Sequence, residues 1–486
     1  MEHLILVRLA SELTLKSRRT RHTFMQRLRY NLVDALSSAS VPHQVNEAWG
    51  RVYIRAASPA ALPVLARVFG ISSYSLVDAV VPAALDDIVA RGREIFTERV
   101  SGHRFAVRAH RVGEHSFRSH DIEVQLGAAL LPAAARVDLT HPEITVEVEV
   151  RNADAYLFSA REPGAGGLPT GVEGRALALI SGGYDSAVAA WLMLKRGIEL
   201  DYVFCNLGGD AYERAVVHVA KALADDWSYG TQPRLHVVDF GEPLRDLRAR
   251  ARQSYWQIVL KRLMYRAASA IGHELQAHAI VTGEAVGQVS SQTLPNLRAI
   301  EPAATLPVFR PLLGFDKEEI IARARSIGTA ALSEQVKEYC AIAPGKPVTA
   351  TTEARAAEED AKLDPAVLDA AVRQRKVLDL RALTPTDLAA SYLFTNEIPA
   401  GAIIFDCRPE PQYNAWHLPG AAHRDEWELL REFKRLDRDH TYVLYCAHGI
   451  QTAYLAEKMQ NAGYEAYSFR GGMKGILEYA RAHGQE

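Results

Sequence analysis

The feature that most constrains the fold is a regular alternation of apolar runs and helical segments over residues 175–284. The runs RALALI, YVFCNL, RLHVVDF and AIVTGE each predict a strand, and a helical pattern separates each run from the next. Strands that alternate with helices are typical of a parallel sheet covered by helices. The glycine- and proline-rich residues 162–174 precede this alternation, and they predict a linker or domain boundary.

The rest of the chain predicts further domains, because 486 residues suffice for about three or four. LILVRL and RVYIRAA predict strands beside a basic helix, and ITVEVEVR alternates as a half-exposed strand does. TTEARAAEEDAKLD predicts a solvated helix, and a smaller α/β pattern begins near residue 394. We therefore expect a multidomain α/β chain whose N-terminal part is α+β, with domains over 1–60, 61–165, 175–390 and 394–486.

Composition excludes several classes of protein. The formal net charge of −2 does not indicate a polyanion-binding molecule as a whole, although local basic patches can still bind one. No apolar run approaches the ~18 residues of a membrane span, and the N-terminus lacks the pattern of a secretion signal. The cysteines are widely spaced without a CxxC pair, so we expect a reduced, cytoplasmic protein with no metal site and no membrane contact. They are Cys205, Cys340, Cys407 and Cys446.

A candidate phosphate loop, SGGYDS, follows the first strand of the alternation directly. Its two glycines allow a tight turn and close approach to a ligand, and a helix N-terminus binds anions through free N–H groups. An ordinary strand–turn–helix, with Ser and Asp capping the helix, explains the same residues. The candidate cofactor-binding residues here are Leu179, Ile180, Ser181, Gly182, Gly183, Asp185 and Ser186.

The loop resembles the SGGxDS loop of the ATP pyrophosphatase family, whose members bind ATP, release pyrophosphate and adenylate a substrate. It differs from the Walker loop, which needs GxxxxGK[ST]. The resemblance implies a parallel-sheet domain of the adenine nucleotide α-hydrolase type, with ATP and Mg²⁺ as cofactors. Asp185 is then a candidate catalytic residue.

Two later segments offer further groups to the same site. The small-residue loop after AIVT forms a candidate second wall for a nucleotide, through Gly283, Gly287 and Gln288. In RPLLGFDKEEII, Lys317 is a candidate catalytic residue, since a lysine near transferring phosphate oxygens offsets developing charge. Asp316 and Glu319 there also fit a helix capping box, and both interpretations can hold together.

Basic residues in the N-terminal half suggest a surface that binds RNA phosphates. If RFAVRAH is a strand, Arg104 and Arg108 share one face, and Arg111 begins the loop beyond. A solvated charged face is the alternative. The run VRAHRVGEHSF followed by DIE resembles the THUMP domain of tRNA-modifying enzymes, and LASELTLKSRRTRHTF resembles the ferredoxin-like domain that accompanies it. The candidate RNA-binding residues are Lys16, Arg18, Arg104, Arg108 and Arg111.

Near the C-terminus, FDCRPEPQYNAWHLPGA resembles the rhodanese signature, and VLYCAHGIQTA resembles the rhodanese loop that curls around a reactive cysteine. Inward backbone N–H groups and the following helix would favour a thiolate or persulfide at Cys446. Related loops commonly carry arginine where this chain has His448 and Ala453. The charge of a protonated His448 would therefore contribute more here to stabilising an anion at Cys446. We expect Cys205 and Cys407 to be packed thiols.

In this order, the domains resemble the tRNA 4-thiouridine synthase family, in its long form with a rhodanese domain. That resemblance implies ATP-dependent sulfur transfer to uridine 8 of tRNA, with a cysteine desulfurase as donor. It also implies a redox-active disulfide between the two catalytic cysteines, Cys340 and Cys446, and a reductant that opens it. Sulfur transfer as persulfide or as free sulfide, and sulfur supply for the thiamine thiazole, stay open. A homodimer is the assembly we consider.

Two other classes of function compete with this interpretation. One is a small-molecule adenylating enzyme that shares the SGGxDS loop, which the rhodanese-like region and the basic N-terminal half argue against. The other is an RNA-binding or sulfur-relay protein with an inactive loop, which the intact motif from Ser181 to Ser186 argues against. Pyrophosphate release in response to tRNA separates the three.

Overall fold

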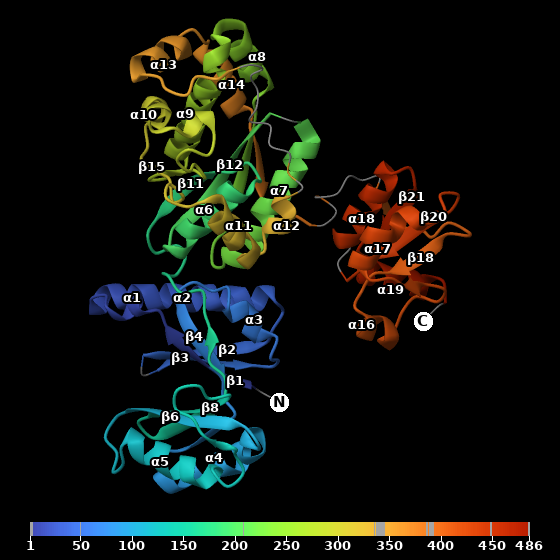
Figure 1. Cartoon of the computed structure of the whole chain (residues 1–486). Helices are drawn as coiled ribbons and strands as arrows, with labels where there is room; N and C mark the ends of the chain where they lie inside the picture. The colour runs from blue at the N-terminus through green and yellow to red at the C-terminus, as the bar shows by residue number, and fades with distance from the viewer. Residues whose placement is uncertain are drawn as a thin grey trace. The chain divides into compact units, whose positions relative to one another are not determined.

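The chain folds into two compact units, shown in Figure 1 as a computed structural model. The first comprises residues 1–207 and 219–377, and the second comprises residues 208–218 and 378–486. Three sheets lie in the first unit and one in the second, so the multidomain α/β class is confirmed. The structure describes residues 3–48, 50–207, 209–334, 336, 346–384, 387, 393–447 and 450–484.

The first sheet is antiparallel and carries its helices on one face. The long helix α2 buries Phe24, Leu28 and Leu32 against it. The sheet extends past residue 60, where we expected this domain to end, because β4 pairs with β1. In order, the strands are β10 (Glu162–Pro163), β4 (Ile71–Leu76), β1 (His3–Leu9), β3 (Arg51–Ala56) and β2 (His43–Ala48), and the helices are α1 (Ser11–Thr14), α2 (Arg18–Ser38) and α3 (Ala61–Leu65).

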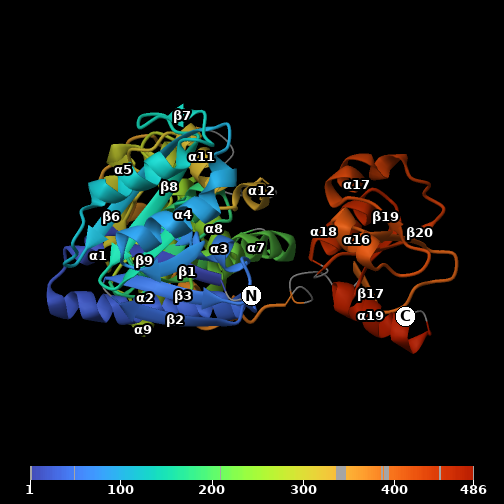
Figure 2. The same cartoon turned by 90° about the horizontal axis from the view of Figure 1, so that it is seen from below.

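The second sheet is mixed, with β6 parallel to β8 and β7, and β9 antiparallel to β8 and β5. Helices α4 and α5 lie side by side against one face (Figures 1 and 2) and bury Ile88, Phe96 and Leu126 there. The elements are β5 (Ala79–Pro82), β9 (Asp154–Phe158), β8 (Ile144–Arg151), β6 (Arg104–Val112), β7 (Arg136–Val137), α4 (Leu85–Val100) and α5 (Ser119–Leu130).

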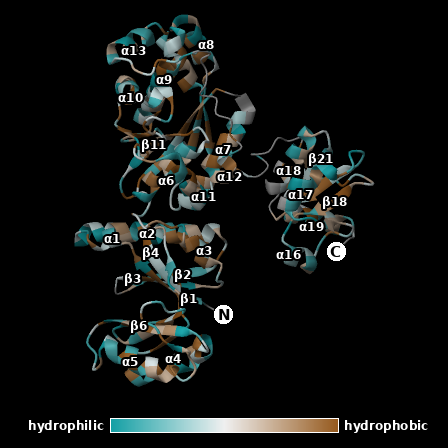
Figure 3. Cartoon of the chain, in the orientation of Figure 1, coloured by the Kyte–Doolittle hydropathy of each residue, from teal (hydrophilic) through white to brown (hydrophobic). Residues whose placement is uncertain are grey.

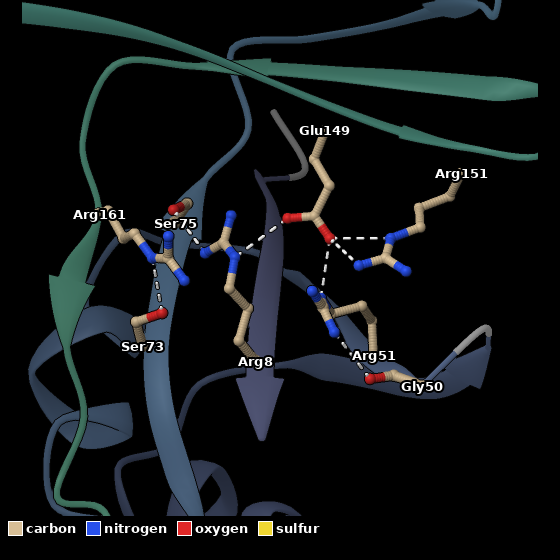
Figure 4. A network of polar contacts seen from close by, with 8 residues as sticks. All are labelled: Arg8, Gly50, Arg51, Ser73, Ser75, Glu149, Arg151 and Arg161. Carbon is tan, nitrogen blue, oxygen red and sulfur yellow. Dashed lines mark hydrogen bonds and ion pairs between the residues drawn. The ribbon is translucent and has the colours of Figure 1, made fainter. Parts of the chain in front are cut away.

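Strand β8 is the predicted half-exposed strand ITVEVEVR, and that prediction is wrong for its second half. Glu149 and Arg151 point away from the apolar core, yet both are buried. Residues of the first sheet cover them: Arg8 Nε lies 3.0 Å and Arg51 Nε 2.8 Å from the Glu149 carboxylate (Figure 4). The polar face of β8 is therefore a junction between two sheets.

The predicted linker at 162–174 packs against both neighbouring parts of the first unit. A Cβ at Gly164 would lie 2.4 Å from the carbonyl oxygen of Ile71, so only glycine fits there. Thr170 is buried, and its carbonyl accepts a 2.8 Å hydrogen bond from Arg27 Nε. Arg27 also donates to the Gly230 carbonyl at 2.7 Å, which connects α2 with the third sheet's domain.

The third sheet is the predicted parallel sheet, in the order β15-β14-β11-β12-β13-β16. From β11 the chain proceeds through β12 and β13 to one side, and it places β14 and β15 on the other side. Ligands of open α/β sheets bind where the strand order reverses, at the carboxyl ends of the strands. The strands are β11 (Arg175–Leu179), β12 (Glu199–Asn206), β13 (Arg234–Asp239), β14 (Ile280–Val281), β15 (Val308–Phe309) and β16 (Lys376–Asp379).

Helices pack on the faces of this sheet. The predicted solvated helix is α13, and one of its faces is buried: Asp360 pairs with Arg262 at 2.9 Å and also with Arg266. The helix is therefore less exposed to solvent than its charged composition led us to expect. The helices are α6 (Tyr184–Lys195), α7 (Gly209–Trp227), α8 (Gly241–Arg250), α9 (Trp256–Glu274), α10 (Leu294–Ile300), α11 (Lys317–Ser326), α12 (Ala330–Ser333), α13 (Glu353–Asp360) and α14 (Pro365–Arg373).

The second unit contains a parallel five-stranded sheet with a buried cluster on each face. In Figure 3 β18 carries hydrophobic colours and the short α16 mostly hydrophilic ones. The elements are β17 (Phe394–Thr395), β21 (Glu465–Phe469), β20 (Thr441–Tyr445), β18 (Ile403–Asp406), β19 (Ala422–His423), α16 (Glu410–Ala415), α17 (Glu426–Glu432), α18 (Ile450–Asn461) and α19 (Gly472–Ala482).

Candidate active site

The loop between β11 and α6 has the geometry of an anion-binding turn. Gly182 has φ +78°, a conformation that favours glycine, and Gly183 is the N-cap of α6. Ser186 Oγ accepts a 3.2 Å hydrogen bond from the Ser181 amide and donates to the Gly183 carbonyl at 3.1 Å. The serine thus braces the turn and leaves the helix N-terminus for a ligand.

Two residues of the predicted loop have a supporting role in the sheet. Ile180 is buried, and its amide donates to the carbonyl of Val203 on β12 at 2.9 Å. Leu179 is the last residue of β11 and packs against two buried clusters. These two residues hold the start of the loop in place.

The second predicted loop follows β14 and meets the first loop at the switch point. A Cβ on Gly283 would lie 2.6 Å from the backbone carbon of Asp185 and 2.6 Å from the Ser186 nitrogen. Only glycine allows this approach. Gly287 has φ +80°, and among the described residues the buried Nε2 of Gln288 has no hydrogen-bond partner. Such a donor needs an acceptor, which a nucleotide can supply.

Lys317 and Asp185 join α11 to α6 beside the loop. Lys317 Nζ donates to both carboxylate oxygens of Asp185, at 2.9 and 3.2 Å. The predicted capping box is also present, since Asp316 Oδ1 accepts from the Glu319 amide at 2.8 Å and Glu319 Oε2 accepts from the Asp316 amide at 3.0 Å. The capping box fixes the first turn of α11 and so fixes the start of the lysine side chain.

Sequence reasoning missed a buried polar cluster directly behind this loop. Glu284 accepts hydrogen bonds from Tyr265 at 2.5 Å, Thr282 at 3.1 Å and Arg310 Nε at 3.0 Å. Burial disfavours the charged carboxylate, but the Lys261 charge and these donors outweigh it, so the pKa of Glu284 lies below its ordinary value. The only sequence signal was an acid directly after an apolar strand.

The donor set suits a phosphate chain better than a bare metal ion. It comprises backbone amides at a helix N-terminus, one lysine and one unpartnered amide group. In the part of the chain that the structure describes, no group of three or more His, Cys, Asp or Glu side chains is placed to hold a metal ion. Nor does any helix there have the length and apolar character to cross a membrane.

In the second unit, Cys446 follows β20 directly and is buried. Thr452 Oγ1, on α18, donates to the Cys446 sulfur at 3.6 Å and lies 2.8 Å from Ser468 Oγ on β21. A hydroxyl donor at this position stabilises negative charge on sulfur. His448, the predicted protonated partner, lies outside the described residues.

Residues of the rhodanese-like signature organise the neighbouring loops. Asp406 is fully buried and holds Arg408 at 2.6 Å. Arg408 also donates to the carbonyl of Trp416 at 2.6 Å. Tyr413 stacks on His417, with ring centroids 3.9 Å apart, and donates to the Ala421 carbonyl at 3.0 Å.

The other cysteines differ in what the structure says of them. Cys340, the predicted second catalytic cysteine, lies outside the described residues, so its disulfide with Cys446 stays a prediction. Cys205 is buried at β12, and burial raises the pKa of its thiol, as a packed cysteine requires. Cys407 is also buried, beside the end of β20.

The predicted RNA-binding residues fall into two groups. Arg18 is the first residue of α2 and is exposed. Lys16 lies two residues before it, with its Nζ over the Phe24 ring. Arg104, Arg108 and Arg111 all lie on β6, so placing Arg111 in a loop was wrong.

The β6 arginines already have protein partners. Arg104 lies 3.5 Å from Asp138 and 3.4 Å from Glu143. Arg108 donates to the Leu139 carbonyl, and Arg111 donates to the Gly113 carbonyl at 2.9 Å. A phosphate contact at β6 would have to share these donors, whereas Arg18 presents its charge to solvent.

Four family models match successive parts of the chain. Family models match the ferredoxin-like domain of ThiI over residues 4–75, the THUMP domain over 82–160, Thiamine biosynthesis protein (ThiI) over 171–364 and the Rhodanese-like domain over 392–479. The chain is similar to a solved structure of a 4-thiouridine synthetase–RNA complex with bound ATP. That likeness has a TM-score of 0.69 at 31% identity, over 78% of this chain and 99% of that one.

Curated relatives match almost from end to end. A tRNA sulfurtransferase of Pyrobaculum aerophilum is 39% identical over 87% of each chain. One from Desulfurococcus amylolyticus is 38% identical over 96% of this chain and 97% of its own length. At these identities and over these lengths, the relatives show that the chain belongs to the tRNA sulfurtransferase family.

Proposed function

We propose that the chain uses ATP to activate uridine 8 of tRNA and replaces its O4 with sulfur, which forms 4-thiouridine. The observation that carries this proposal is the ion pair of Lys317 and Asp185 beside the glycine turn between β11 and α6. It occurs in a chain whose relatives are named tRNA sulfurtransferases. The likeness to an RNA complex with bound ATP supports both substrates.

In this proposal the turn at Gly182 and Gly183 binds the pyrophosphate end of ATP, and Gln288 Nε2 donates to the same ligand. Lys317 offsets charge on the phosphate oxygens as the bond to pyrophosphate breaks. Mg²⁺ is commonly held by one or two carboxylates together with phosphates, and Asp185 is the carboxylate at this loop. Adenylation converts O4 of the uridine into a leaving group, which departs with AMP.

Sulfur reaches the uridine from Cys446, which receives it as a persulfide from a cysteine desulfurase. Either the outer sulfur attacks C4 and Cys340 then cleaves the S–S bond, or Cys340 first releases sulfide, which attacks. Both routes expel AMP and leave a Cys340–Cys446 disulfide, which a reductant must open before the next turnover. The role of Cys340 is implied by the family resemblance.

Sulfur supply for the thiamine thiazole is a second candidate function. It is supported by the description of the matching family model as a thiamine biosynthesis protein. That role would use Cys446 and would not require tRNA, so a variant in the N-terminal RNA surface would retain it.

The test combines the purified chain with unmodified tRNA, ATP, Mg²⁺, a cysteine desulfurase and cysteine. We expect 4-thiouridine in the digested tRNA, and none with Cys446→Ala or Asp185→Ala. Failure of the unaltered chain to thiolate tRNA under these conditions contradicts the proposal. Pyrophosphate release without tRNA would favour a small-molecule adenylating enzyme, and no release at all would favour a relay protein.

A further inference from the structure

Cys407 and Cys446 directly follow two adjacent parallel strands, β18 and β20. Asp406, the last residue of β18, pairs with Tyr445, the last residue of β20, and each cysteine is the residue that follows. The Cys407 amide donates to the Tyr445 carbonyl at 2.8 Å, which closes this pair and holds Cys407 beside the end of β20. Adjacent strands lie ~4.8 Å apart, within the Cα separation of ~4.4–6.8 Å that a disulfide spans.

Both side chains also point to the same face of the sheet. Alternate residues of a strand share a face, and Phe405, Cys407, Leu444 and Cys446 belong to one buried cluster. Tyr445, which lies between Leu444 and Cys446 in sequence, belongs to the cluster on the opposite face. The two sulfurs therefore approach each other inside one compact unit.

We propose that Cys407 is a resolving thiol for the carrier cysteine. This inference rests on the proposed persulfide at Cys446. The Cys407 thiolate attacks Sγ of Cys446, the bond from Sγ to the outer sulfur breaks, and hydrosulfide leaves with the electron pair. The thiol proton of Cys407 goes to solvent. The outer sulfur is reduced to sulfide, and the two cysteines are oxidised to a Cys407–Cys446 disulfide.

The environment of Cys407 slows this reaction. Burial, and next the neighbouring sulfur of Cys446, raise the pKa of the Cys407 thiol, so little thiolate is present at neutral pH. A persulfide that meets an activated tRNA before Cys407 reacts therefore transfers its sulfur to that tRNA. Otherwise the outer sulfur is released as sulfide, and Cys446 stays in a disulfide with Cys407 until a reductant opens it.

The test uses the full-length chain with Cys340→Ala, which removes the other predicted disulfide partner. The reduced protein is loaded by a cysteine desulfurase with cysteine and then separated from both, and its intact mass and released sulfide are followed without tRNA or ATP. We expect a gain of one sulfur, then its loss together with two hydrogens, with one sulfide released per chain. Digestion should yield the peptides of Cys407 and Cys446 joined by a disulfide.

With Cys407→Ser added, the persulfide should persist roughly tenfold longer or more, because a positioned intramolecular nucleophile is lost. With Cys205→Ser added instead, which alters a buried thiol in the third sheet, the persulfide should decay as fast as in the Cys340→Ala chain. Equal decay with and without Cys407 overturns the inference, as does sulfide release without the linked peptides. If no sulfur loads on Cys446, the persulfide proposal itself fails. The linked peptides are measured in a chain that keeps Cys407, so a folding defect of Cys407→Ser cannot produce them.

Discussion

Lys317 Nζ donates to both carboxylate oxygens of Asp185, at 2.9 and 3.2 Å, and so joins the first turns of α11 and α6 beside the glycine turn between β11 and α6. The two residues are far apart in sequence but lie at the same end of the parallel sheet. An ion pair this exposed contributes little to stability, about 0–1 kcal/mol. Its position at a helix N-terminus that can bind anions indicates a chemical role instead.

Lys317→Met should therefore lower the rate of tRNA thiolation roughly 100- to 1000-fold, as loss of one charge-stabilising donor typically does. Stability should change little. Rates at saturating ATP and thermal unfolding of the same samples test both statements. Lys362→Met is a matched control, since Lys362 pairs with Glu359 at 2.8 Å with a similarly exposed side chain. Equal rates for the two variants would remove Lys317 from the mechanism.

Gly283→Ala should impair ATP use through backbone displacement. The new Cβ would meet the Asp185 carbon and the Ser186 nitrogen at 2.6 Å, and backbone cannot move aside as a flexible side chain does. A shift of about 1 Å in a phosphate loop can cost roughly 100-fold in rate. We expect that loss in kcat/KM for ATP.

Gly314→Ala is the control for this substitution, because a Cβ at Gly314 meets nothing within 4 Å. It should leave kcat/KM for ATP unchanged. Full activity of Gly283→Ala would mean that the two loops do not meet as closely in the working enzyme.

The sequence predicted the third sheet and the glycine turn between β11 and α6 well, because strand–helix alternation and a glycine turn are local signals. It predicted neither the contact of Gly283 with Asp185 nor the burial of Glu284, since both depend on strand order. The period-2 pattern of β8 correctly separated an apolar face from a polar one. It contained no information on whether another sheet covers the polar face, so the burial of Glu149 was missed. Arg104 likewise fitted a predicted basic surface by composition. Its acidic partners, Asp138 and Glu143, were missed because they lie in a separate segment.

Arg18→Ala should weaken tRNA binding more than Arg104→Ala does. Arg18 is exposed at the start of α2, whereas Arg104 is partly neutralised by Asp138 and Glu143. Losing one phosphate contact lowers the slope of log affinity against log salt by about 1. Titrations with labelled tRNA at several salt concentrations measure this slope.

The control for the RNA surface is Arg91→Ala. Arg91 lies on α4, pairs with Glu94 at 2.6 Å, and is not among the predicted RNA-binding residues. It should leave affinity and slope unchanged. A larger effect for Arg104 than for Arg18 would move the RNA surface from α2 to β6.

Glu149→Gln should destabilise the junction between the first two sheets. The carboxylate is buried and bonds Arg8, Arg51 and Arg151 (Figure 4). Removing its charge leaves these guanidinium groups without their acid, which costs about 3–5 kcal/mol for a buried ion pair. Denaturant unfolding should show this loss near pH 7. Glu94→Gln, at a surface pair, should cost about 0–1 kcal/mol.

The same carboxylate should make stability depend on pH. Burial opposes its ionisation, but the charges of Arg51 and Arg8 and the Arg151 hydrogen bond outweigh burial, so the pKa of Glu149 lies below its ordinary value of 4.5. A depressed pKa gives a contribution that is complete above pH 4.5 and is lost as the pH falls through the folded-state pKa. The difference in unfolding free energy between the unaltered chain and Glu149→Gln should therefore be constant above that pH and shrink below it. A difference that grows in acid would mean that Glu149 is protonated at the junction and that its partners are held by other groups.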